Sequence, residues 1–244
     1  MLLLQYLMLQ IPSLQPAHDA AQMNRLHETQ TEAQRTIAKH VGAYPMWISG
    51  EVDESRWDDL VRKFSELYET DISASARQWR KRRNACCAHL IGAPLPRGKI
   101  RWILMVTADG EGEVKRRERL RDAHDARMVW GDYMLVRATR ASALGGGTRW
   151  TWFLAPHVEH REARYLAKVA QTAATHRQPS QLSAFADTLL KRPLHSGVRQ
   201  QVARMLRRAQ RVWMKHAKGM PWPGPDPGAL PHIGRYRQVI APQG

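Results

Sequence analysis

The sequence predicts an α+β protein, and three observations support this prediction. Apolar residues recur at helical spacing in the first 90 residues and again beyond residue 158. Between these regions lie three runs of strand length, at 100–107, 133–140 and 148–154. Finally, 43% of the 244 residues are hydrophobic and nine are Trp, which suffices for a buried core and argues against wholesale disorder.

The first 92 residues are expected to be mainly helical. A weak apolar stripe predicts a helix over 16–41, and 44–49 form a short strand candidate. An amphipathic helix over 53–69 is expected to begin with Asp53 as its N-cap, because acidic residues follow in the first turn, where the helix dipole favours them.

A third helix is expected from Ser73 or Ser75 to about Leu90, and it would carry both cysteines of the chain. Cys86 and Cys87 are adjacent, so they cannot join distant segments and do not have the spacing of zinc ligands. We expect one of the two thiols to face the core. A reducing, cytoplasmic compartment fits this cysteine usage.

The apolar run over residues 1–9 has some features of a signal sequence. It lacks a basic n-region and a small-residue cleavage site, and it is too short to span a bilayer. We expect one of two explanations for this run. Either it forms a buried strand, or it lies upstream of the true translation start, which would then be Met8 or Met23. No membrane-spanning segment is expected in the chain.

Residues 98–176 are expected to form a small mixed sheet with helices, after a loop over 92–98. The expected elements are a central strand over 100–107, a charged helix over 114–129, strands over 133–140 and 148–154, and a helix over 159–175. This β-α-β-β-α order resembles the ferredoxin-like folds of RNA-recognition domains, CRISPR repeat-processing proteins and rolling-circle (HUH) nucleases. The resemblance implies a single ferredoxin-like sheet.

Residues 177–244 are expected to hold a helical pair and an extended tail. A short helix begins near 178–181 and ends before Pro193, and a long helix capped by Ser196 runs to Lys218. Six prolines exclude a further helix over 221–244. The chain is therefore expected to have three parts, 1–92, 98–176 and 177–244.

Charge is divided unevenly along the chain. Residues 1–76 hold 6 Lys and Arg against 11 Asp and Glu, a net charge of −5, whereas residues 77–244 hold 32 against 11, a net charge of +21. Like charge of this size opposes compaction and indicates an acidic partner, of which nucleic acid is the commonest. Arg outnumbers Lys 29 to 9, and its planar fork suits phosphate, although codon usage in a GC-rich genome is an alternative source of the excess.

Two basic elements are the predicted nucleic-acid contacts. On the long C-terminal helix, apolar residues fill one arc and an acid-free basic arc lies opposite: Arg204, Arg207, Arg208, Arg211, Lys215 and Lys218. Solvated helix faces usually mix Glu with Lys instead. The second element surrounds Trp79, which can stack an unpaired base or anchor its helix in the core: Arg77, Arg80, Lys81, Arg82 and Arg83.

Three weaker features have simpler explanations. The basic residues over 115–127 alternate with acids, as on a solvated, salt-bridged surface. Gly145-Gly146-Gly147 lies between two strand candidates, so a hairpin connection is favoured over a phosphate-binding loop. Trp150 and Trp152 share one face of a strand and can form a base-stacking platform or seat a helix on the sheet.

One cluster resembles catalytic machinery: His157, His160, Tyr165 and Lys168. In the HUH nucleases two His one residue apart on a strand bind a metal, and a Tyr on a following helix, often with a Lys three residues on, attacks the DNA phosphate. The spacing of Tyr165 and Lys168 fits that pattern, whereas the two His lie beyond the strand candidate at 148–154. The resemblance implies a metal-dependent strand-nicking enzyme using Tyr165 as an alternative function.

The sequence thus predicts a non-catalytic accessory protein that binds DNA or RNA through backbone phosphates, without metal or cofactor and without membrane contact. Other subunits of a mobile-element or CRISPR-type nucleoprotein assembly are expected partners. The alternatives are the nicking enzyme, a protein-interaction subunit with a basic face, and a housekeeping fold with an Arg-rich surface. The acidic helix over 53–69 is expected to pack against the basic half and compete with nucleic acid.

Overall fold

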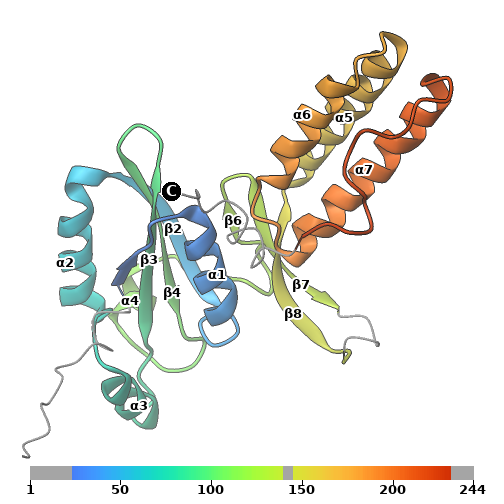
Figure 1. The fold of residues 1–244 in the computed structure, drawn as a ribbon. Helices are drawn as coiled ribbons and strands as arrows, with labels where there is room; N and C mark the ends of the chain where they lie inside the picture. Colours follow the sequence, from blue (N-terminus) through green and yellow to red (C-terminus); the bar gives the residue numbers. More distant parts are fainter. Residues whose placement is uncertain (1–23, 140–144, 232–244) are drawn as a thin grey trace, which may run out of the picture. The chain divides into compact units, whose positions relative to one another are not determined.

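The fold is taken from a computed structural model, in which residues 24–139 and 145–231 are described (Figure 1). This part of the chain divides into two compact units. The first comprises residues up to Ala33 together with Ala43–Leu120, and the second comprises Gln34–Gly42 together with the residues from Arg121 onward. Each unit combines helices with antiparallel strands, which confirms the α+β class. The division into three parts stays a prediction.

The first unit is built on a sheet whose strands lie in the order β1-β3-β4-β2. Their bounds are Asn24–Leu26 (β1), Met46–Asp53 (β2), Ala88–Leu95 (β3) and Lys99–Val106 (β4). Strand β4 is central and runs antiparallel to β2 and β3, whereas β1 is parallel to β3. Residues 103–106 of β4 are completely buried, so the expected strand buried on both faces is confirmed.

Three helices accompany this sheet. Helix α2 (Trp57–Tyr68) follows a 3₁₀ turn, η2 (Glu54–Arg56), and α3 (Ala74–Arg82) and α4 (Glu113–Arg117) come later in the chain. Helix α2 buries Trp57, Phe64 and Tyr68, and the Phe64 ring meets Trp102 of β4 edge-on at 5.4 Å between centroids. This stripe at helical spacing explains why the segment folds as an amphipathic helix.

The second unit joins a small sheet to a helical bundle. Strands β6 (Val129–Trp130), β7 (Tyr133–Thr139) and β8 (Thr148–Leu154) form an antiparallel sheet in that order, and β5 is the two-residue strand Arg121–Asp122. Helices α5 (Pro156–Thr175), α6 (Pro179–Leu190) and α7 (Ser196–His216) enclose a core that includes Leu166, Leu182, Leu206 and Trp213. Helix α1 (Gln30–His40) contributes its residues from Gln34 onward.

The helix expected to reach Leu90 is shorter than predicted. It ends at Arg82, and Asn84 has a left-handed backbone with φ of 53°. The chain then continues as β3, whose first six residues are buried, so the expected loop at 92–98 is instead the end of β3 and the turn into β4. Cys86 and Cys87 lie just before β3, and both are buried rather than one alone.

The prediction of a charged helix over 114–129 is also wrong beyond the first turn of that helix. Only Glu113–Arg117 is helical, and the following residues form β5, a turn and β6. A helix needs a continuous apolar face to pack, and here the buried residues Val114, Ala123 and Met128 do not share one.

The single ferredoxin-like sheet is therefore not confirmed. Strand β4 pairs with β2 and β3, whereas β7 pairs with β6 on one side and with β8 on the other in a separate sheet. The hairpin of β7 and β8 agrees with the expectation for 133–154 over the described residues. Gly145, Gly146 and Gly147 before β8 all have positive φ, a conformation that glycine adopts without strain.

Four helix starts differ from expectation, and one of them is that of α5, which begins at Pro156 rather than at residue 159. Helix α1 begins at Gln30, and β1 occupies 24–26, within the segment predicted as helix; residues 16–23 and 1–9 lie outside the described residues. Asp53 ends β2 and makes no capping hydrogen bond. His195 occupies the N-cap position of α7, and the Ser196 hydroxyl instead lies 2.8 Å from that of Thr151.

The helices near the C-terminus otherwise follow the sequence pattern. Helix α6 ends before Pro193, α7 ends at His216, and residues 221–231 contain no helix or strand. Leu230 and Trp222 of this segment pack on the core of the bundle. In the described part of the chain, every helix is too short or too polar to cross a membrane.

Candidate nucleic-acid interface

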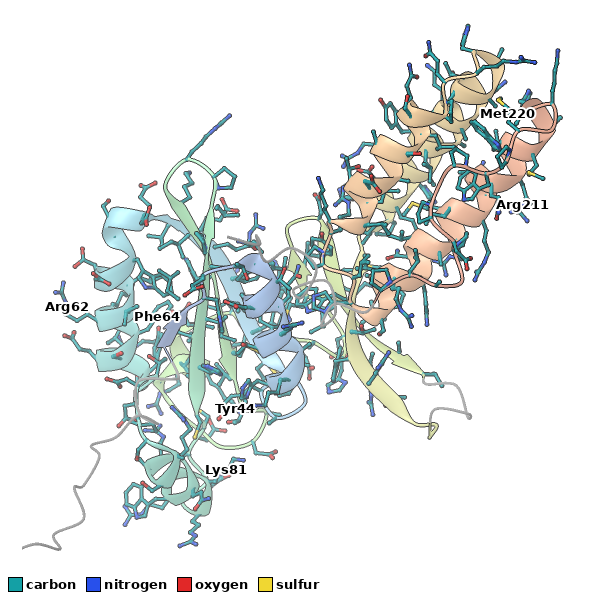
Figure 2. All side chains as sticks on the ribbon, viewed as in Figure 1. Tyr44, Arg62, Phe64, Lys81, Arg211 and Met220 are labelled. Atoms are coloured by element: carbon teal, nitrogen blue, oxygen red, sulfur yellow. The ribbon has the colours of Figure 1, made fainter. Side chains whose placement is uncertain are left out.

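Helix α7 separates apolar and cationic side chains as its sequence predicts. Its buried side includes Val198, Val202, Leu206, Ala209 and Trp213. The predicted contacts on the opposite side are all exposed: Arg204, Arg207, Arg208, Arg211, Lys215 and Lys218. Arg211 extends from the outer side of the helix (Figure 2). Lys218 lies two residues beyond the helix end, with a left-handed backbone.

Close backbone packing fixes α7 against strand β8. A Cβ on Gly197 would lie 2.4 Å from the Trp152 carbonyl oxygen, so only glycine permits this approach. One turn later the buried Gln201 side chain accepts a hydrogen bond from Leu154 N at 2.7 Å and donates to Leu154 O at 3.1 Å and to a Glu159 carboxylate oxygen at 2.6 Å. These contacts set which side of α7 remains exposed.

Few of the α7 cations are neutralised. Arg204 pairs with Glu159 of α5 at 2.9 Å, and the helix itself contains no acidic residue. Within the described residues, no carboxylate forms an ion pair with the other five predicted cations of this element. The exposed side of α7 therefore keeps most of its positive charge.

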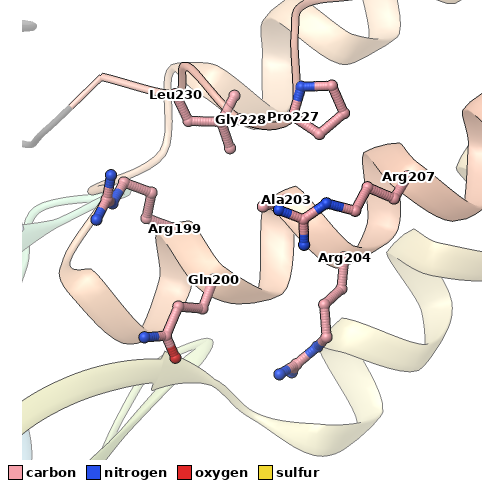
Figure 3. Close-up of a pocket in the computed structure, with 8 residues that line it drawn as sticks. All are labelled: Arg199, Gln200, Ala203, Arg204, Arg207, Pro227, Gly228 and Leu230. Carbon is pink, nitrogen blue, oxygen red and sulfur yellow. The ribbon is translucent and has the colours of Figure 1, made fainter. Parts of the chain in front are cut away.

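Two pockets adjoin the cationic side of α7. One, of about 420 Å³, lies between α7 and the segment 227–230, and Arg199, Arg204 and Arg207 contribute to its lining (Figure 3). The other, of about 280 Å³, lies at the C-terminal end of the helix, where Arg177, Lys215 and Lys218 line it. Both recesses bring cationic groups together.

The second predicted element, on α3, is only partly exposed. Arg77 is buried, with 8% of its surface accessible, and Arg80 pairs with Glu69 and donates from Nε to the Cys86 carbonyl at 3.1 Å. The other three members of the cluster are exposed: Lys81, Arg82 and Arg83. Lys81 lies on the outer side of α3 (Figure 2).

Trp79 of α3 is not a core anchor, since 53% of its surface is exposed. The guanidinium carbon of Arg83 lies 3.8 Å from its ring centroid. An exposed indole beside cations is the arrangement that base stacking requires.

The weaker candidates behave as ordinary structural features. Arg116 and Arg117 both pair with Glu113, as expected for a salt-bridged surface. Trp152 is completely buried and donates from Nε1 to the Gln34 carbonyl at 2.7 Å, so it seats a segment of α1 on β8. Trp150 is half-buried and meets His124 edge-on, and the pair does not form an open stacking platform.

The residues of the catalytic alternative all lie on α5. His157, His160, Tyr165 and Lys168 are exposed, and the two His occupy the first turns of the helix rather than a strand. The Tyr165 ring packs edge-on against Phe185 of α6 at 4.7 Å between centroids. No group of three or more His, Cys, Asp or Glu residues suited to a metal ion occurs among the residues that the structure describes.

Sequence reasoning missed several residues that shape this interface. Gln201 sits among apolar residues and gives no periodic signal, and the pocket residues Pro227, Gly228 and Leu230 come from a segment that looks like a simple tail. Comparison of the sequence with family models and with curated proteins, and of the fold with solved structures, finds no match.

Proposed function

We propose that the protein binds nucleic acid through backbone phosphates, with the exposed cationic side of α7 as the principal contact. The observation that supports this most is the row of exposed cations from Arg207 to Lys218 with no acidic residue on the helix and no ion-pair partner among the described carboxylates. Unneutralised like charges repel one another, and a polyanion relieves that repulsion.

The length of the row also suits a polynucleotide. Residues 204–215 span about 16 Å at 1.5 Å per residue, which is enough to meet several phosphates of a strand. Four of the six cations on this side are Arg, whose fork can hold a phosphate through two bonds. The exposed end of α3, with Lys81, Arg82 and Arg83 around Trp79, is proposed as a second contact.

The test is a salt titration of binding to single- and double-stranded DNA and RNA. The slope of log affinity against log salt should flatten by about one unit for each phosphate that a variant no longer binds. We expect the triple variant Arg208→Gln, Arg211→Gln, Lys215→Gln, which removes three cations without an ion-pair partner among the described residues, to bind more weakly and with a flatter slope than the parent protein.

The matched control is the double variant Arg116→Gln, Arg117→Gln. These two side chains are exposed but already paired with Glu113, so their removal changes net charge without removing a free cation. At salt concentrations near 0.15 M, where the screening length is about 8 Å, this control should bind like the parent.

Absence of binding at low salt would overturn the proposal, and an unchanged slope in the triple variant would exclude α7 as the phosphate-binding element. A manganese-supplemented nicking assay accompanies the titration. Strand cleavage that disappears in Tyr165→Phe would replace the non-catalytic proposal with the strand-nicking alternative.

A further inference from the structure

The pocket between α7 and the segment 227–230 has the dimensions of a small-ligand site. Its volume is about 420 Å³, within the range of about 300–1,000 Å³ typical of such sites. Figure 3 shows the eight lining residues, which come from α7 and from the overlying segment: Arg199, Gln200, Ala203, Arg204, Arg207, Pro227, Gly228 and Leu230. A nucleotide is of suitable size for this space.

Two of the three guanidinium groups are available to a ligand. Arg207 folds back along the helix toward Ala203, whereas Arg204 points away from the 227–230 segment (Figure 3) and pairs with Glu159. Arg199 is half-buried and lines the pocket, and no carboxylate among the described residues forms an ion pair with it. A cation without an ion-pair partner attracts an anion, and this attraction is stronger where the site is partly shielded from water.

The wall opposite α7, formed by the segment 227–230, is apolar, and contacts within residues 222–230 fix its conformation. Pro227 is buried and 6% of Leu230 is exposed. The Asp226 carboxylate accepts from Gly228 N at 2.8 Å, and the Asp226 carbonyl accepts from Ala229 N at 3.2 Å. Trp222 Nε1 donates to Pro225 O at 3.1 Å. Because the segment holds its turn by these bonds, the pocket exists without a ligand, which lowers the entropy cost of binding.

We infer that this pocket binds one nucleoside phosphate, with Arg199 and Arg207 on the phosphate and Pro227 and Leu230 against the sugar or base. The two cations and the apolar wall together favour a nucleotide over inorganic phosphate, which has nothing to place on the wall. The inference deepens the proposed function and rests on it where the nucleoside phosphate is a unit of a bound strand. The same chemistry is offered by a free nucleotide.

The experiment titrates the full chain with 5′-AMP, with inorganic phosphate and with a labelled oligonucleotide. Arg207→Gln removes a ligand cation, and Ala203→Leu fills the pocket without changing charge. Arg207→Gln should weaken 5′-AMP binding about tenfold, the effect of losing one hydrogen bond to a charged group, and Ala203→Leu should weaken it because the larger side chain occupies the space of the ligand. The control is Arg164→Gln, which makes the same charge change at an exposed position of α5 outside the pocket and should bind as the parent does.

The outcomes of these titrations distinguish failure of the nucleotide site from failure of the proposed function. If 5′-AMP binds and both pocket variants weaken its binding, the proposed nucleotide site is supported. Displacement of the oligonucleotide by 5′-AMP would then show that the site holds a unit of a bound strand. A lack of displacement would show that it holds a free nucleotide. Oligonucleotide binding without 5′-AMP binding, or 5′-AMP binding that Arg207→Gln leaves intact, overturns the pocket while the proposed function stands. If neither ligand binds, both fail. Arg207 is exposed, so its variant tests the pocket even where Ala203→Leu disturbs the fold.

Discussion

The guanidinium of Arg83 lies over the indole of Trp79, at 3.8 Å from its ring centroid, on a part of α3 where more than half of the tryptophan surface remains exposed. Neither side chain is needed to fill the core of the first unit. An aromatic ring held at the surface by a cation is well placed to meet an unpaired base while neighbouring cations meet the phosphates.

Replacing Trp79 with Ala should therefore weaken binding of single strands and leave duplex binding nearly unchanged. Stacking of one base contributes about 1–3 kcal/mol, which corresponds to a loss of roughly 5- to 150-fold in affinity. Trp79→Phe keeps an aromatic face and should retain most of the affinity. Equal losses for single and double strands would show that Trp79 acts through something other than base stacking.

Arg77, although part of the same basic cluster, should not contribute to binding. It is buried, burial lowers the pKa of its guanidinium, and Nε and Nη2 have no hydrogen-bond partner among the described residues. Replacing a poorly compensated buried charge with an apolar side chain of similar length is often neutral or stabilising. We expect Arg77→Met to keep or raise the free energy of unfolding in urea and to leave nucleic-acid affinity unchanged. A loss of more than about 2 kcal/mol would mean that the buried charge is compensated after all.

The stability of the second unit should fall in mild acid because of His195. Its Nε2 lies 3.0 Å from Oε1 of Gln34, and burial, with a smaller effect of the Arg35 charge, lowers its pKa from 6.5 to about 4. As pH falls below 6.5, His195 takes up a proton in the unfolded chain but not yet in the folded chain. The contribution of the neutral His195 to the free energy of unfolding is therefore fully present above about pH 6.5 and is lost progressively down to about pH 4. The loss is about 3 kcal/mol.

Urea unfolding at pH 7 and pH 4.5 measures this effect, with His195→Gln as the comparison. Gln does not titrate and can still donate to Gln34, so the variant should show a smaller difference between the two pH values than the parent. Carboxylates titrate alike in both proteins and cancel in the comparison. Equal pH dependence in parent and variant would contradict the assignment to His195.

Gly197→Ala should destabilise the protein, although the substitution lies in a helix where Ala is normally favoured by up to about 1 kcal/mol. The new Cβ would lie 2.4 Å from a backbone oxygen of Trp152 and 2.7 Å from the Phe153 ring. Because the backbone cannot yield as a flexible side chain does, we expect a net loss of about 1–3 kcal/mol in urea unfolding. Gln210→Ala, on the same helix and outside this region of close packing, should change stability by less than about 0.5 kcal/mol in either direction, as ordinary surface substitutions do.

The sequence was most informative where one periodic pattern covered a whole element. The two faces of α7, the β7–β8 hairpin and the central position of β4 follow directly from apolar spacing and length. The segment after Arg82 was harder, because a buried strand and a buried helix share a continuous apolar run, and the left-handed turn at Asn84 leaves only a weak signal.

The candidate site, too, could be predicted from the sequence only in part. Exposure of the α7 cations could be predicted, since an apolar arc implies an opposite polar arc. Burial of Arg77 and exposure of Trp79 could not, because both lie on one short helix whose orientation depends on its packing with distant residues. The pocket over Arg207 could not be predicted either, since it is formed by tertiary contact with residues 20 or more positions further along the chain.

The assignment of residues 34–42 to the second unit has a consequence for how the chain can be divided. Gln34 supplies the acceptors for both Trp152 Nε1 and His195 Nε2, so a truncation that removes the first 72 residues would also remove part of the unit that carries α7. Since the units are interleaved in sequence, no single cut releases either of them whole. The competition expected from the acidic helix is better tested by neutralising its carboxylates in place, and during synthesis the second unit cannot complete its core until the last helix meets a segment made near the beginning.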